Sequence, residues 1–470
     1  MQDSPEAGRE ARSLTGQFAR ACAAWDAGTL PDAVRARAKL VVLDTLGAML
    51  SASRPVFPGT RRLERFVRAQ GAGPCPVVGT SLATTPVDAA LMNGYLAYAL
   101  DVESHHGPAI VHAAAAVLPA ALSAAATDPA DGAAFLAAAA LGIEVACRVA
   151  LAIGPNDLYA RGLHPTAIGG AFGAAVAVGK LLGLDADGLE RALGLAATEA
   201  CGLLAWATDD SEESRPLNPG LAARNGVTAA RLAATGFGAP RGVFDPRGKY
   251  TVYGAWSLDG AGRPERLLGG FGEHFAVMDL IFKRHACCAF LHPALDALLE
   301  IRAEDGLGGD DVAAIEIRFP RSGAPMIDGN PLRSHRAQYI LPLAATRGVV
   351  DFADVIVDRS GEPAIRRLAA ATTFVHDDEL DPLYPERYVT RLSVTDRAGA
   401  VHARRVDWAR GTPENPMSDG ELVAKFRRLA ADRVAPDVAD ELARVLLDLD
   451  RQAGMERLFA LLRVDDAPGG

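Results

Sequence analysis

The sequence predicts a mainly α-helical protein, in which a large helical domain is joined to a second, smaller α+β domain. Hydrophobic residues make up 49% of its 470 residues and aromatic residues only 6%, a balance that favours closely packed helices over an aromatic-rich β-sandwich. A chain of this length exceeds what one hydrophobic core usually supports. We therefore expect one domain formed by 1–276 together with 411–470, and a second formed by 277–410.

The large domain is predicted from apolar residues that recur three and four positions apart, as on the buried face of a helix. Seven such segments are bounded by Gly, Pro or Asp, and they span 34–51, 85–101, 111–126, 132–154, 166–182, 189–204 and 222–235. Asp185 is expected to cap the sixth, since its carboxylate can accept hydrogen bonds from free backbone N–H groups. Ser418 and Glu421 have capping-box spacing, so a helix that returns to the large domain is expected there.

The smaller domain is predicted from a change of pattern near Lys283. A helix at 292–304 is followed by an alternating stretch at 312–319, which predicts a strand. Two further alternating stretches, 388–395 and 400–407, are separated by a short turn and predict a β-hairpin. Strands and helices together indicate an α+β domain.

Charge and targeting signals exclude several classes of protein. The net charge is −10 and the arginines are dispersed, so nucleic acid is not an expected partner. The first twelve residues are polar and lack the apolar core of a signal peptide. The alanine-rich run at 133–149 is interrupted by Glu144 and Arg148, which argues against a membrane span. We expect a cytoplasmic protein that does not bind a membrane.

The cysteines give no sign of a metal centre. Six are present, at positions 22, 75, 147, 201, 287 and 288. They form no C-x-x-C pair and no zinc-like ladder with histidines, so neither structural disulfides nor a metal is expected. Spacing alone leaves an iron–sulfur cluster open, although the clustered run that such clusters use is missing.

Candidate catalytic residues begin with a histidine-rich loop. A predicted apolar helix leads into a polar segment that contains Asp101, His105, His106 and His112. Imidazole titrates near neutrality and can give or take a proton, so this cluster suits general acid–base catalysis. A metal site and solvent-exposed histidines are the alternatives.

A further histidine, His164, stands directly before a predicted helix in which Gly170 and Gly173 permit close approach to a neighbour. The proline that follows His164 fixes the angle at which the chain enters the helix. A helix N-terminus attracts a carboxylate ligand and disfavours a charged imidazole. His164 is therefore a second candidate pocket residue, with a histidine that caps the helix as the alternative.

Two cations complete the set of candidates. Arg215 lies at a proline-fixed turn and can hold a carboxylate through two parallel hydrogen bonds, with a surface arginine as the alternative. Lys283 lies with Cys287 and Cys288 at the proposed domain junction, and small-molecule sites concentrate in clefts between domains. The cysteines are expected to pack against or line this cleft, since vicinal disulfides are strained and rare.

Taken in this order, the four segments resemble the MmgE/PrpD family, which includes 2-methylcitrate dehydratase, cis-aconitate decarboxylase and iminodisuccinate epimerase. The resemblance covers nearly the whole chain. Its supporting stretches are 43–47, 163–166, 170–173, 180–185, 240–242, 283–292, 337–342 and 415–419. Their joint order is more specific than any one of them.

The resemblance implies that Asp101, His112, His164 and Lys283 match the pocket residues of the family. It also implies that the smaller domain is lid-like, that the protein is a homodimer, and that no metal or cofactor is required. The substrate implied is a small carboxylate.

Departures from the family pattern affect the expected substrate. Arg215 and Asn218 stand where the family usually has a lysine and a histidine. An arginine can hold a carboxylate but cannot donate a proton at neutral pH. His105 or His106 replaces a threonine and a tryptophan of decarboxylase-like members, and Cys288 replaces a histidine of some of them. These changes weaken the transfer of decarboxylation in particular.

The predicted reaction is that of a lyase which removes a proton α to a carboxylate and expels a β-hydroxyl. His112 and His164 form the acid and base pair, in an order that the sequence leaves open, and Asp101 orients a histidine. Carboxylates of the substrate are bound by Lys283 and Arg215, and further substrate contacts are expected from Asn218, His105, His106 and Cys288. An epimerase, then a decarboxylase, and last a non-catalytic binding protein are the alternatives.

Overall fold

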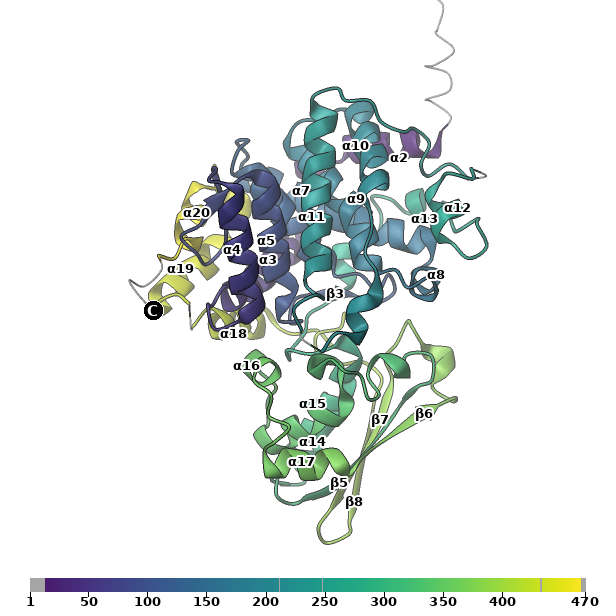
Figure 1. Ribbon diagram of the computed structural model, residues 1–470, viewed down its shortest axis with the longest axis vertical. Helices are drawn as coiled ribbons and strands as arrows, with labels where there is room; N and C mark the ends of the chain where they lie inside the picture. The colour runs from purple at the N-terminus through teal and green to yellow at the C-terminus, as the bar shows by residue number, and fades with distance from the viewer. Residues whose placement is uncertain (1–12, 211, 247, 432, 466–470) are drawn as a thin grey trace, which may run out of the picture.

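The computed structural model describes residues 13–210, 212–246, 248–431 and 433–465. In Figure 1 a larger helical part lies above a smaller part that combines helices with a four-stranded sheet. Helices account for 56% of the protein. The predicted mainly α fold is confirmed.

The centre of the larger part is a set of alanine-rich helices: α5 (Pro86–Ala99), α6 (Ala113–Ala125), α7 (Gly132–Ile153), α9 (Pro165–Leu181) and α11 (Leu217–Ala234). Small residues bring them close together. A Cβ atom on Gly173 of α9 would lie 2.3 Å from the backbone oxygen of Gly142 on α7, so glycine is required there. The close approach predicted for this helix is confirmed.

Helix α7 is long and apolar enough to cross a membrane by length and composition alone. In its most apolar stretch, however, 94% of the residues are buried inside the protein. It packs against α9 and α6, which is the environment of a core helix.

Further helices surround this centre. They are α2 (Leu14–Ala24), α3 (Asp32–Ala52), α4 (Pro58–Gln70), α8 (Pro155–Ala160), α10 (Ala186–Glu199), α12 (Val252–Trp256) and α13 (Glu265–Leu268). Helices α2, α4, α8, α12 and α13 were not expected from the sequence. In α4 only three residues are buried, so it lacks the continuous apolar pattern by which the central helices were recognised.

Helix ends agree with the sequence except at the end of α10 and at the start of α11, which begins at Leu217 where residue 222 was expected. The carboxylate of Asp185 accepts a hydrogen bond from the N–H of Gly188 at 2.8 Å, and the capping box of Ser418 and Glu421 is present. Helix α10 was expected to run to residue 204, but it ends at Glu199. The chain then turns at Gly202, where a Cβ atom would lie 2.4 Å from the Cβ of Ala167.

The smaller part is built on a sheet in the order β6-β5-β7-β8. Its strands are β5 (Val312–Pro320), β6 (Thr372–Asp377), β7 (Thr390–Asp396) and β8 (Val401–Val406), and its helices are α14 (His292–Glu304), α15 (Ala337–Arg347), α16 (Phe352–Ile356) and α17 (Pro363–Ala370). The pair β7–β8 is the predicted hairpin, which is confirmed. Strand β6, which was not expected, pairs in parallel with β5.

The two parts meet at short strands and through the end of the chain. Strand β3 (His105–His106) of the larger part pairs with β4 (Leu280–Ile281), which leads into the smaller part. After β8 come the helices α18 (Asp419–Ala430), α19 (Pro436–Leu447) and α20 (Glu456–Leu462). Helices α18 and α19 pack against α3 and each other, and α20 packs against α19 (Figure 1). The remaining two-residue strands, β1 (Cys75–Pro76) and β2 (Ala83–Thr84), pair with each other.

Candidate active site

A small cavity lies where the two parts meet. Its volume is about 30 Å³, room for about two water molecules. It is lined by Tyr98, Asp101, His105, Ile110, His112, Tyr159, His164, Trp206, Lys283, Cys288, Ala289, Phe290, Met326 and His335. The four residues that the family resemblance placed in one pocket, Asp101, His112, His164 and Lys283, are therefore together.

Asp101 and Lys283 form a buried ion pair at this cavity. The Lys283 ammonium contacts Asp101 Oδ1 and donates to the backbone oxygen of the same residue at 3.0 Å. Asp101 has a φ of 54°, and Ile110 on the same loop has a φ of 53°. A left-handed conformation is unusual for residues other than glycine and concentrates at functional sites. The loop between α5 and α6 is thus held in a shape that its local sequence does not favour.

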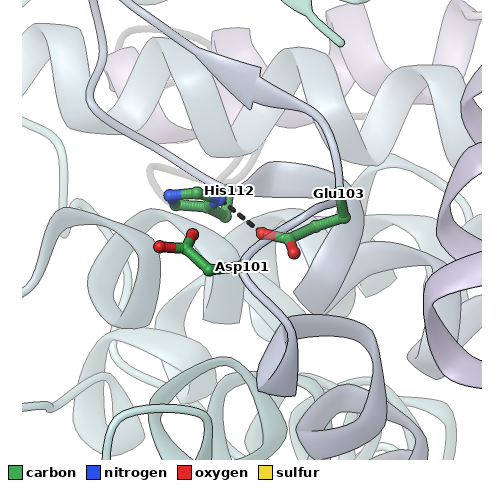
Figure 2. A group of neighbouring side chains, drawn as sticks. All are labelled: Asp101, Glu103 and His112. Carbon is green, nitrogen blue, oxygen red and sulfur yellow. Dashed lines mark hydrogen bonds and ion pairs between the residues drawn. The ribbon is translucent and has the colours of Figure 1, made fainter. Parts of the chain in front are cut away.

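Figure 2 shows that the partner of His112 is Glu103. The Nδ1 atom of His112 lies 2.5 Å from Glu103 Oε1, and both side chains are buried. We predicted that Asp101 would orient a histidine, and for His112 this is wrong, because the loop directs Glu103 to it. The imidazole nitrogen nearest to Asp101 is Nε2 of His335, at 4.0 Å from Asp101 Oδ2.

Burial changes the proton affinity of this pair. It raises the pKa of Glu103 to about 7, although the Lys283 ammonium acts in the opposite direction. Burial, with a further contribution from Lys283, lowers the pKa of His112 well below its usual value. His112 is therefore neutral at pH 7, and the carboxyl beside it exchanges its proton near the same pH.

His164 precedes α9 as predicted, but its side chain does not cap that helix. Its ring packs against Tyr98, with centroids 6.0 Å apart, and against Trp206, with centroids 5.3 Å apart. Burial lowers its pKa well below the ordinary value. Its Nδ1 atom has no hydrogen-bond partner among the described residues, so the imidazole is neutral and free to contact a ligand.

Arg215 is buried behind the cavity and does not line it. Its guanidinium stacks on Tyr98 at 4.4 Å from the ring centroid and donates to the backbone oxygen of Ala99 at 3.3 Å. It also lies 3.8 Å from Asp101 Oδ1. Direct contact with the substrate was expected of Arg215, and the geometry places Tyr98 and Asp101 in between.

The other predicted contacts divide into two groups. His105 and Cys288 line the cavity, whereas His106 and Asn218 do not. Consecutive residues of a strand point to opposite faces, so only one of His105 and His106 faces the cavity. The Nδ1 atom of His106 accepts from the N–H of Ala109 at 3.1 Å instead.

Asn218 lies in the first turn of α11, near Gly202. Cys288 lines the cavity as a neutral side chain. Burial raises the pKa of the Cys288 thiol to about 12, so it carries no charge at neutral pH.

Sequence reasoning missed several lining or adjacent residues, above all Glu103 and His335. Glu103 follows Asp101 by two positions in a polar loop, which was a usable signal. His335 lies in the short 3₁₀ helix η6 (Arg333–His335) of the smaller part. No motif in the sequence marked it.

Among the residues that the structure describes, one group of side chains has the geometry to hold a metal ion. Asp101, Glu103 and His112 each offer a ligand atom, and these atoms lie within 4.8 Å of one another. Figure 2 shows the three neighbouring side chains. Two of the donors are already engaged, because Lys283 contacts Asp101 and a short hydrogen bond joins His112 to Glu103. A divalent ion would have to displace both a proton and an ammonium group.

Comparison with known proteins identifies the family. The MmgE/PrpD N-terminal domain matches residues 16–257 and the MmgE/PrpD C-terminal domain matches residues 285–451. Similar proteins include a cis-aconitate decarboxylase from Aspergillus terreus, 27% identical over 92% of each chain. A cis-aconitate decarboxylase from Homo sapiens is 27% identical over 97% of this chain and 96% of its own. The chain belongs to the MmgE/PrpD family.

Proposed function

We propose that this protein is a cofactor-independent lyase that acts on a small polycarboxylate by acid–base chemistry. The observation that carries the proposal is the meeting of two neutral, buried histidines, His112 and His164, with the Lys283 ammonium at one cavity. These groups supply a base, an acid and a positive charge. The names of the relatives, which are cis-aconitate decarboxylases, support a carboxylic acid as the substrate.

His112 is the base in this mechanism. When Glu103 is ionised it accepts the Nδ1 proton of His112, so that the lone pair of Nε2 is available to remove a proton α to a substrate carboxylate. A carboxylate that fixes the tautomer of a catalytic histidine and stabilises the imidazolium is a recurring arrangement. The low pKa of His112 keeps the base unprotonated in the resting enzyme.

His164 becomes the acid once the substrate is bound. In the resting protein it is neutral because of its burial. A polycarboxylate brings negative charge into the cavity and raises the pKa of a nearby imidazole, so His164 takes up a proton with the substrate. It then donates this proton to the departing β-hydroxyl.

Lys283 stabilises the negative charge that develops when the α-proton leaves. Its ammonium is held by Asp101 and faces the cavity. A preorganised positive charge at a developing enolate is the largest contribution that such a site makes to catalysis. Arg215, which lies behind Tyr98 and Asp101, adds a second positive charge without touching the substrate.

Dehydration of a hydroxy-polycarboxylate is the leading reaction, because a base, an acid and an enolate-stabilising cation are what a β-elimination needs. Decarboxylation of an unsaturated polycarboxylate is the second candidate, since the relatives carry that name. Decarboxylation ranks lower because Cys288 stands where some decarboxylase-like members have a histidine, and its thiol stays neutral at neutral pH. Epimerisation is the third, because two histidines at one cavity can exchange a proton between two faces of a carbon.

One NMR experiment separates the candidates. The protein is incubated in deuterated buffer with citrate, 2-methylcitrate, cis-aconitate and iminodisuccinate in turn. Formation of an alkene from a hydroxy acid supports dehydration, loss of carbon dioxide supports decarboxylation, and exchange with inversion supports epimerisation. Absence of turnover and of exchange with every compound would overturn the proposal. Full activity of His112→Ala or His164→Ala would overturn the acid–base pair.

A further inference from the structure

Glu212 is a buried carboxylate that connects the larger part of the protein to the smaller one. It lies ahead of α11 and has a φ of 61°, which residues other than glycine rarely adopt. Its Oε1 accepts from the backbone N–H of Ser334 at 3.0 Å, and its Oε2 accepts from the hydroxyl of Ser334 at 2.9 Å. Ser334 belongs to η6, so these hydrogen bonds join the two parts beside the cavity.

Ser334 in turn fixes the tautomer of His335. A hydroxyl has one proton, and both oxygens of Glu212 are placed as acceptors: Oε1 accepts from the N–H of Ser334, and Oε2 lies 4.0 Å from Nε of Arg215. The Ser334 proton therefore points to Glu212, and the Ser334 oxygen, 2.9 Å from Nδ1 of His335, accepts from that nitrogen. With its proton on Nδ1, His335 presents an unprotonated Nε2.

The Nε2 atom of His335 faces a second acceptor across the cavity. It lies 4.0 Å from Oδ2 of Asp101, and this oxygen has no hydrogen-bond partner among the described residues. His335 lines the cavity and packs against Trp206, with ring centroids 5.9 Å apart. Two acceptors without a donor between them favour a ligand that brings a proton, and they repel a carboxylate.

We propose that His335 is a specificity-determining residue that accepts a hydrogen bond from a hydroxyl of the substrate, and that Glu212 and Ser334 are the positioning residues that keep it an acceptor. This proposal rests on the lyase function proposed above and narrows its substrate class to hydroxy-polycarboxylates. The hydroxyl oxygen can accept from His164 while its proton is donated to His335. An unsaturated acid, which has no hydroxyl, leaves the two acceptors unsatisfied.

Binding of matched ligands to His112→Ala, which lacks the proposed base, tests the proposal without turnover. Citrate and tricarballylate differ by one hydroxyl, as do malate and succinate, and calorimetry measures their Kd values. We expect the hydroxy acid of at least one pair to bind about tenfold more tightly, because its absence leaves buried acceptors unpaired. Equal affinities within both pairs, or no binding of any of the four, would overturn the proposal. Because binding is measured without turnover, a preference for the hydroxy acid can still be detected if the proposed lyase activity is not found.

Variants of the positioning residues sharpen the test. In Glu212→Gln the amide donates to the Ser334 oxygen, which turns the hydroxyl proton toward Nδ1 of His335 and leaves the proton of His335 on Nε2. The preference for the hydroxy acid is then expected to fall below about threefold. Ser334→Ala has the same effect, and Ser334→Thr, which keeps the hydroxyl, restores the preference. Glu213→Gln is the matched control, since Glu213 contacts Arg62 on the surface.

The tautomer itself is observable. Nitrogen-15 NMR of protein labelled at its 10 histidines distinguishes a protonated Nδ1 from a protonated Nε2, and loss of a signal in His335→Gln assigns the resonance. We expect a protonated Nδ1 in the wild type and a protonated Nε2 in Glu212→Gln. A protonated Nε2 in the unliganded wild type would contradict the proposal, whatever the variants do to activity or folding.

Discussion

Two buried lysine–aspartate pairs in this protein are chemically alike but differ in their surroundings. Lys425 of α18 contacts Asp44 of α3 at 2.5 Å, and both residues lie in regular helices and do not line the cavity around His112. The Lys425 ammonium also donates to the backbone oxygen of Val102 at 2.6 Å, so this pair supports the loop that carries Asp101 and Glu103. Lys283 and Asp101 lie in loops and line that cavity. The first pair joins α18, near the end of the chain, to α3 of the larger part, whereas the second faces the cavity.

The pairs also differ in their electrostatics. Burial lowers the pKa of Lys425, and Asp44 only partly offsets it. Burial acts on Lys283 in the same direction, but Asp101 and Glu103 outweigh it and raise the pKa of Lys283. A buried charge alone therefore does not mark a functional residue. Glu103 acts on both lysines, so what distinguishes the pair to which we assign a catalytic role is its place at the cavity and carboxylates strong enough to outweigh burial.

Removing each lysine gives the largest predicted contrast. Lys283→Met is expected to lower kcat at least about 10³-fold, because an enolate forms without its stabilising charge. Lys425→Met is expected to lower the free energy of unfolding by about 3–5 kcal/mol, since Asp44 loses its buried partner. Activity on the compound found by NMR and chemical denaturation of both variants measure the two effects. Loss of activity without loss of stability in Lys425→Met would reverse the assignment of the pairs.

Two buried glutamates extend the comparison. Glu103→Gln is expected to lower kcat about 10²- to 10⁴-fold, because the amide donates to Nδ1 of His112 and selects the wrong tautomer. Glu144 of α7 accepts hydrogen bonds from Arg148 at 2.5 Å and from the N–H of Ala276 at 2.6 Å. It does not line the cavity. Glu144→Gln is the matched control, and its kcat is expected to stay within about threefold of wild type. Equal losses in the two variants would contradict a catalytic role for Glu103.

A site residue could be predicted from the sequence where its position depends on local structure, and could not where it depends on contacts between distant segments. His112 and His164 were found because each precedes an alanine-rich helix whose start is visible in the pattern. The pairing of Glu103 with His112 depends on the left-handed backbone of Asp101 and Ile110, which no local propensity predicts. His335 lies more than 200 positions after His112 in the sequence. It reaches the cavity only because the smaller part of the protein packs on the larger one.

The fold shows the same division. The central helices were predicted within a few residues because their apolar faces are continuous, whereas the mostly exposed α4 was missed. Strand β6 has a half-exposed burial pattern without alternation, and it gains its place only by pairing in parallel with β5. Such non-local pairings leave no periodic signal in the sequence.

The pH dependence of Glu103 separates catalysis from stability. The base requires ionised Glu103, so kcat/KM is expected to rise about tenfold per pH unit below a pKa of about 7 and to level off above it. Stability has the opposite sign, because the folded pKa of Glu103 lies above its unfolded value: its contribution is complete below about pH 4.5 and falls as pH rises toward 7. Glu103→Gln is expected to remove this part of the stability profile, measured by denaturation between pH 4.5 and 7.

A flat kcat/KM profile across pH 5–8, together with an unchanged stability profile in Glu103→Gln, would show that Glu103 is not the group that titrates. The matched variant Glu144→Gln controls for the loss of any buried carboxyl. The pKa of Glu144 is also raised by burial, but it lies outside the cavity.

Metal ions give the smallest predicted effect, and they test whether the positive charge beside Asp101 is an ammonium or a cation from solution. Asp101, Glu103 and His112 have the geometry of a metal site, but Lys283 and the proton shared by His112 and Glu103 occupy two of the donors. Chelation, or addition of zinc or magnesium, is therefore expected to change kcat less than about twofold, because binding would have to displace both. If chelation abolished activity and a divalent ion restored it, the site would use a metal where we assign Lys283. In Lys283→Met the competing ammonium is gone. If a divalent ion restores part of the activity of this variant but adds nothing to wild type, the metal ion and the Lys283 ammonium serve the same purpose.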